Sequence, residues 1–211
     1  MMHDTVSNAL YAYWNEVRKD RLAPRRFEID PARIAALLPD TFIIERVDGA
    51  TSRFRLAGTR ICEVFGVEFR GVNVFDLFND EDRTTLQRQI SVIALHGAVG
   101  RFVLAANTAT TLTAKFEMSL MPLVHTREIV DRFVGSIAAL ESLPWLGTVP
   151  LTTLRILSHD LVWPDGRPHA MIDNMHRQPP FIAHLGEGRI VRSDRRQFRV
   201  YDGGLSVSDE D

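Results

Sequence analysis

RFRLAGTRICEVFGVEFRG, residues 53–71, is the stretch of the sequence that decides the fold. Within it, Phe54 and Leu56 alternate with arginines, which is the period-two pattern of a half-buried strand. Gly58 then allows a sharp turn of the backbone, and Thr59 is predicted to cap the short helix that follows. A strand that ends at a glycine and leads into a short capped helix is typical of a small sensor-type fold and not of a catalytic loop.

The chain before this stretch predicts a helical flank and a β-hairpin. Apolar side chains recur at three- and four-residue steps in residues 6–17, and Asp30 followed by proline is a typical start of a second helix. Two β-prone runs within residues 41–56 are joined by Asp48 and the glycine after it, which is a hairpin turn signal. We therefore expect residues 1–40 to form a helical flank.

The chain after this stretch predicts one longer helix and three strands. The helix is expected to begin in the acidic run after Asn79, which suits the helix dipole, and to end at Gly97. Strands are expected over residues 101–106, 112–121 and 132–140, and the second has the clearest alternation of apolar and polar residues.

The order of these elements predicts an α+β fold with a five-stranded antiparallel sheet and its helices on one face. The core is expected to span residues 41–147. Residues 148–211 are expected to form a partly disordered C-terminal extension that the core does not need in order to fold, because residues 164–211 contain many Pro, Gly, Arg and Asp residues and little periodicity. Residues 151–162 of this extension could form one more helix or an extended arm.

The composition excludes several classes of protein. Of the 211 residues, 45% are apolar and 25% are charged, as in an average soluble globular protein. The formal net charge of -2 gives no field that would attract nucleic acid, and no segment approaches the run of about 18 apolar residues that membrane insertion needs. The chain has a single cysteine, Cys62, and residues 1–14 lack the basic and apolar regions of a signal peptide, so none is expected there. These features favour a reducing compartment, so we expect a cytoplasmic protein.

Four stretches of the chain resemble a PAS-like family of alphaproteobacterial proteins catalogued as a domain of unknown function. They are YWNEVRKDRLAPRR (13–26), DPARIAALLPDTFIIER (30–46), FRLAGTRICEVFGVEFRG (54–71) and PWLG (144–147). The resemblance covers residues 10–147. It implies a small bacterial sensory or regulatory protein that is not an enzyme and that acts through partner signalling proteins.

The resemblance also implies a space between sheet and helices that is either filled as core or open as a ligand pocket. The apolar side chains expected to line it are Phe54, Leu56, Cys62, Phe65, Phe75, Phe116 and Met118. A sensor that binds a small apolar ligand there is the first hypothesis. The alternatives are a ligand-free interaction adaptor with a filled core and a small enzyme that uses the same cavity.

Flavin, haem and metal cofactors are not expected. Light-sensing PAS relatives carry a reactive cysteine directly after a Gly-x-Asn, and the matching position here is Val74, whereas Cys62 is interpreted as a small buried residue. His96 lies where haem-binding relatives place a ligand, but a single histidine at a helix end is typical of a capping residue. The sequence also has no nucleophile elbow, phosphate loop or metal-ligand spacing, so no catalytic residue is predicted.

Two arginine clusters stand out, one within residues 21–26 and one within residues 192–199. Each matches the short arginine motif of PilZ-type cyclic-dinucleotide receptors, but too few residues follow the second cluster to form the barrel that completes such a site. We interpret both clusters as solvated or ion-paired arginines, and recognition of a nucleotide or of an acidic partner stays open.

The apolar stripe of the first helix predicts an association surface. Val6, Leu10, Trp14 and Val17 form this stripe, which lies outside the minimal PAS fold. Such a stripe is covered either by the protein's own sheet or by a second copy of the chain. We predict a homodimer that is held partly by this helix, because aromatic residues are enriched at protein interfaces.

Overall fold

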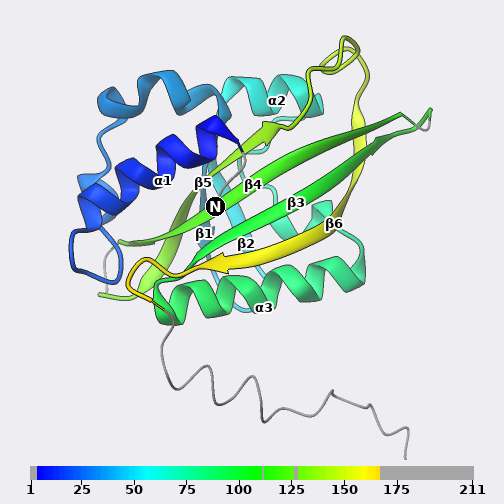
Figure 1. Ribbon diagram of the computed structural model, residues 1–211. Helices are drawn as coiled ribbons and strands as arrows, with labels where there is room; N and C mark the ends of the chain where they lie inside the picture. The colour runs from blue at the N-terminus through cyan, green and yellow to red at the C-terminus, as the bar shows by residue number, and fades with distance from the viewer. Residues whose placement is uncertain (1–3, 111, 126–127, 167–211) are drawn as a thin grey trace, which may run out of the picture.

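The computed structural model describes residues 4–110, 112–125 and 128–166 (Figure 1). In chain order, the elements are α1 (Thr5–Arg18), η1 (Arg26–Glu28), η2 (Pro31–Asp40), β1 (Thr41–Arg46), β2 (Ser52–Ala57), α2 (Thr59–Phe65), η3 (Val74–Leu77), α3 (Asp80–His96), β3 (Val99–Thr108), β4 (Thr113–Val124), β5 (Val130–Ala139) and β6 (Leu151–Val162). The strands form one antiparallel sheet in the order β2-β1-β5-β4-β3-β6, which confirms the α+β class. The arginine cluster at residues 192–199 lies outside the described residues.

Strand β6 is the largest difference from the sequence-based fold. It pairs with β3 along its whole length, so the predicted count of five strands is wrong, and the C-terminal extension expected from residue 148 contains an edge strand. Two features make this strand difficult to predict from the sequence. Its ladder with β3 is irregular at two points, which interrupts the period of two, and residues 157–160 are exposed and therefore need not be apolar.

The sheet carries an apolar cluster on each face. Phe42 and Ile44 belong to one cluster and Ile43, between them, belongs to the other, as the alternation of side chains along a strand requires. Helices α2 and α3 cover the first cluster, whereas α1 and η2 cover the second. The prediction that the helices of the core lie on one face is therefore confirmed for α2 and α3, whereas the N-terminal flank packs on the opposite face (Figure 1).

Helix α1 is held on the sheet by one aromatic anchor and a buried row of serines. Trp14 is fully buried, and its Nε1 donates a hydrogen bond of 2.9 Å to the carbonyl oxygen of Pro122 in β4. Near the start of the helix, Ser7 Oγ lies 3.1 Å from Ser136 Oγ, which in turn lies 2.8 Å from Ser119 Oγ. These contacts satisfy the polar groups that α1 covers, so the helix packs as part of the domain.

The apolar stripe on α1 is thus covered by the protein's own sheet. Leu10 and Trp14 have no exposed surface, and both pack in the cluster with Ile43 and Met121. Of the two arrangements that the sequence allows for this stripe, the structure has the intramolecular one. The homodimer stays a prediction, and it requires surface other than these two side chains.

Gly58 is the N-cap of α2, in place of the predicted Thr59. Its φ of -66° is accessible to any residue, so its backbone conformation does not require glycine. The requirement comes from space, since a Cβ atom there would lie 2.2 Å from the carbonyl oxygens of both Leu38 and Pro39. Gly66, in contrast, ends the helix at φ 66°, in the left-handed region that favours glycine.

Candidate functional site

The seven predicted pocket residues lie mostly in one place. Phe54, Phe65, Phe75, Phe116 and Met118 are buried in the cluster between the sheet and α2 and α3, and Cys62 packs at its margin. Sequence periodicity therefore identified the apolar interior of the domain.

Leu56 is the exception and lies outside this cluster, with 43% of its surface exposed. The cause is a β-bulge in the β1–β2 hairpin. Ile43 lies opposite Leu56 but Ile44 lies opposite Phe54, so Arg55 is the extra residue. Phe54 and Leu56 therefore face opposite sides of the sheet, which simple alternation cannot predict.

Aromatic rings fill the space between the sheet and the helices. The Phe65 ring centroid lies 5.5 Å from that of Phe69 and 5.3 Å from that of Phe116, and Phe54 lies 5.0 Å from Phe69. The two cavities that touch Phe65 measure about 110 and 70 Å³. Pockets for small molecules usually measure about 300–1,000 Å³, so neither of these cavities has the volume of a ligand site.

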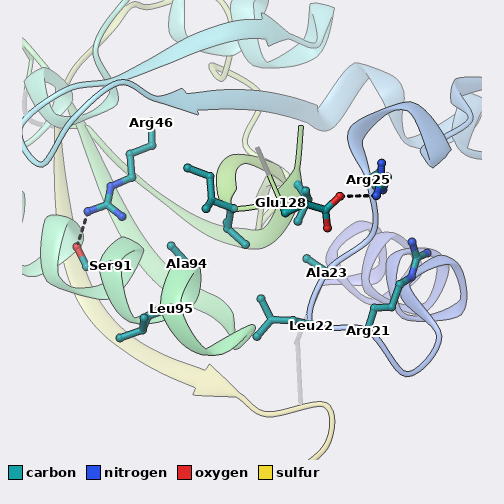
Figure 2. A pocket seen from close by; sticks show the side chains of 12 residues that line it. Arg21, Leu22, Ala23, Arg25, Arg46, Ser91, Ala94, Leu95 and Glu128 are labelled. Atoms are coloured by element: carbon teal, nitrogen blue, oxygen red, sulfur yellow. Dashed lines mark hydrogen bonds and ion pairs between the residues drawn. The ribbon is translucent and has the colours of Figure 1, made fainter. Parts of the chain in front are cut away.

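A cavity of about 780 Å³ lies outside this core, where the N-terminal flank meets the end of α3 (Figure 2). We call it the flank groove. Its lining comes from the segment after α1, the end of β1, the last turns of α3, the end of β4 and the start of β5 with the two residues before it. The lining residues are Arg21, Leu22, Ala23, Arg25, Arg46, Ser91, Ala94, Leu95, Val124, Glu128, Ile129 and Val130.

Backbone contacts hold the flank in position along one side of the groove. Gly97 ends α3 at φ 66°, and a Cβ atom there would lie 2.7 Å from Leu22 Cγ, so the flank crosses the end of α3 at close range. The backbone N–H of Val124 donates a hydrogen bond of 3.0 Å to the carbonyl oxygen of Pro24. The flank is thereby held against both α3 and β4, which contribute other lining residues of the groove.

A buried arginine connects the same flank to the end of the described chain. Arg18, at the end of α1, donates to both carboxylate oxygens of Asp165 at 2.9 and 2.7 Å and to the carbonyl oxygen of Arg21 at 2.8 Å. The hydrogen bond from Arg18 is the main reason why the pKa of Asp165 is lowered. Arg18 therefore fixes the turn from which Arg21 and Leu22 enter the groove.

The groove contains three arginines and one carboxylate. Arg21 forms an ion pair of 2.9 Å with Glu28, and its hydrogen bond is the main cause that lowers the pKa of Glu28. Arg25 is paired with Glu128 across the rim (Figure 2). Arg46 has no ion pair within the described residues, and its side chain donates only to Ser91 Oγ, at 3.3 Å.

Exposed aliphatic side chains form the rest of the groove. Leu22, Leu95 and Ile129 have 47, 72 and 56% of their surfaces exposed. Single exposed apolar residues are common, but three that share one cavity are typical of a binding surface. The flank groove thus combines a guanidinium that forms no ion pair among the described residues with an apolar wall.

The sequence contained only one signal for this groove. Arg21 and Arg25 belong to the predicted arginine cluster and line the groove, and both are ion-paired, as predicted. Arg26, the third member, is not among the lining residues. The other lining residues come from elements far apart in the chain, and no local pattern connects them.

The candidate cofactor ligands Cys62 and His96, and Val74 at the position of the reactive cysteine, lie outside the flank groove. Cys62 is half-buried on α2, Val74 is buried in η3, and the ring of His96 packs 6.4 Å from that of Trp163. Within the described ranges, no group of three His, Cys, Asp or Glu side chains could hold a metal ion. In the same residues, no helix combines the length and the apolar character needed to cross a membrane.

The family of the chain follows from comparison with known proteins. A family model described as the PAS domain matches residues 1–138, which is more than half of the sequence. The chain belongs to the PAS domain family. The match includes every residue of the flank groove, whereas β6 of this PAS domain lies beyond it.

Solved structures similar to this PAS domain include a LOV protein from Rhodobacter sphaeroides. Its identity is 16% and its TM-score 0.41, over 55% of this chain and 71% of that chain. Another is the PAS domain of an HTR-like protein from Haloarcula marismortui, with 19% identity and a TM-score of 0.38 over 55% of this chain and 95% of that one. A comparison with curated proteins gives no match. Membership of the PAS family supports a sensory or regulatory role.

Proposed function

We propose that this PAS protein is a sensory or regulatory protein that receives its signal in the flank groove and not in the aromatic core. The observation that carries the proposal is the difference in volume, about 780 Å³ in the groove against about 110 and 70 Å³ beside Phe65. A small apolar ligand in the core, lined by Phe54 and Phe116, would have to displace packed rings. The groove needs no such rearrangement, because its apolar side chains are already exposed.

The walls of the groove suggest how binding there would pass on a signal. One wall is the flank that continues from α1, and the other walls are α3 and the β4–β5 hairpin. An occupant that touches both sides stabilises the arrangement in which the flank is docked. A change at the groove therefore reaches α1, on the opposite face of the sheet, through Arg18 and Arg21.

We further propose that the output goes to partner signalling proteins, that the protein acts in the cytoplasm and that it is not an enzyme. PAS domains commonly mediate contacts with signalling partners, which supports the first point. The single cysteine, Cys62, supports a reducing compartment. A homodimer belongs to the same proposal, although Leu10 and Trp14 are covered by the protein's own sheet.

The proposal is tested by blocking the groove from an exposed position. Ser91→Trp places a large side chain in the groove, and Thr84→Trp places the same residue two turns earlier on the exposed side of α3, outside the groove. We expect native mass spectrometry of the gently purified full chain to show a bound small molecule in the wild type and in Thr84→Trp, and none in Ser91→Trp. If Ser91→Trp retains the same molecule, the groove is not the site.

A further inference from the structure

We infer that the flank groove binds a free single-chain amphiphile with an anionic head, a carboxylate or a phosphate, with the head on Arg46 and the tail on Leu22, Leu95 and Ile129. The inference rests on the proposed function, because it names the ligand class of that same groove.

Arg46 is the group that selects an anion. A guanidinium has five N–H donors in a planar fork, and this one uses a single hydrogen bond, to the neutral Ser91 hydroxyl at 3.3 Å. Arg21 and Arg25 already have Glu28 and Glu128 as partners. Carboxylate and phosphate oxygens match the geometry of the fork that Arg46 leaves open, and they bind it in a bidentate way.

The apolar wall selects a tail. Leu22 comes from the flank, Leu95 from the last turn of α3 and Ile129 from the position directly before β5, so exposed aliphatic groups line the cavity from three parts of the fold. An alkyl chain removes these surfaces from water without any hydrogen-bonding demand, since the wall offers it only carbon atoms. A purely polar anion would leave them exposed.

The arrangement of the two parts fits one molecule. In Figure 2, Arg46 extends from β1 toward Ser91 at one end, while Leu22 and Leu95 lie along the side formed by the flank and α3. The volume of about 780 Å³ lies within the usual range for small-molecule sites. The pairs Arg21–Glu28 and Arg25–Glu128 leave Arg46 as the groove arginine without an ion pair among the described residues, although its charge is a minor cause of the lowered pKa of nearby Asp48.

The test is calorimetric titration of the full chain with dodecanoate and dodecyl phosphate, below the concentrations at which they form micelles. Both are expected to bind the wild type at one site. Arg46→Gln is expected to weaken binding about ten- to a hundredfold, the range of one lost charge-assisted interaction. Arg88→Gln, an exposed arginine on α3 outside the groove, is the matched control and is expected to bind as the wild type does.

Two further probes separate the possible failures. If uncharged dodecyl maltoside binds as tightly as dodecanoate and Ser91→Trp abolishes both, the groove is the ligand site but the anionic head is wrong. If Ser91→Trp leaves dodecanoate binding unchanged, the groove itself is wrong. If phosphatidylglycerol vesicles sediment the protein in an Arg46-dependent way while dodecanoate does not bind, the source is a membrane surface, and the inferred free amphiphile is overturned.

Discussion

At the scale of single residues, Gly58 shows how a correct position can have an unexpected cause. The glycine turns the chain between β2 and α2, but its φ is ordinary, and the constraint is the carbonyl oxygens of Leu38 and Pro39 beside it. A local sequence pattern indicates that a glycine is needed, and only the packed neighbour shows why.

Gly58→Val is therefore expected to destabilise the domain by about 1–3 kcal/mol, because the added side chain must push η2 away from α2. Gly49→Val is the matched control, since no atom lies within 4 Å of a Cβ placed at Gly49. Urea unfolding of both variants measures the difference. Equal midpoints for the two variants would contradict the close approach of η2.

Asp40 is a second residue whose behaviour depends on its surroundings. It is buried beside Arg60, and desolvation raises its pKa above the ordinary value, although Arg60 acts in the opposite direction. Because the folded state then holds the proton more tightly than the unfolded state, this group makes stability fall as the pH rises from about 4.

Asp40→Asn removes that titration. We expect the free energy of unfolding of this variant, relative to that of the wild type, to increase as the pH increases from 4 to 7. Any pH-independent effect of the substitution shifts all of these differences by the same amount. Urea midpoints of both proteins at several pH values in this range provide the comparison. A constant difference between the two proteins would mean that Asp40 titrates as it does in the unfolded chain.

At the scale of elements, β6 changes the view of where the domain ends. Leu151 and Leu154 belong to the apolar cluster that α2 and α3 cover, and the backbone N–H of Ile156 donates a hydrogen bond of 3.2 Å to Asp82 of α3. The strand therefore joins the core, although sequence reasoning placed it in a loose extension that the core does not need.

Leu154→Ala is expected to cost about 2–4 kcal/mol, since the side chain is only 3% exposed and its loss leaves a cavity. Leu157→Ala, on the same strand but 53% exposed, is expected to change stability by less than about 0.5 kcal/mol. Thermal or urea unfolding of the full chain distinguishes the two. Similar small effects would show that β6 does not pack on the core.

At the scale of the whole molecule, the position of α1 bears on association. Its stripe is buried on the sheet, so removing the helix uncovers Ile43, Met121 and Val134. A chain that begins at Asp20 is expected to unfold at a lower temperature and to self-associate, because that sheet face becomes exposed to water.

Light scattering on this shortened chain and on the full chain tests both α1 and the homodimer. A full chain of twice the monomer mass supports the predicted dimer. A full chain that is monomeric at micromolar concentration contradicts the dimer and leaves α1 as an intramolecular cap. Unchanged melting of the shortened chain would mean that α1 contributes little to the fold.

The sequence by itself determined the local features of this protein. The period of residues 6–17 predicted α1, Asp48 predicted the turn of the β1–β2 hairpin, and Asn79 and Gly97 marked the two ends of α3, where they act as caps. Each depends on residues close together in the chain, so a short window contains the information. The resemblance of four stretches correctly indicated the PAS family.

Only the tertiary structure decided the sixth strand, the side of the sheet that α1 covers, the orientation of Leu56 and the flank groove. An edge strand such as β6 is specified by its partner β3, and Leu56 faces away from Phe54 because of a bulge against β1. The groove joins Leu22, Arg46 and Ile129, which are distant in the chain. These features depend on contacts between segments far apart in sequence, and no local pattern encodes which segments meet.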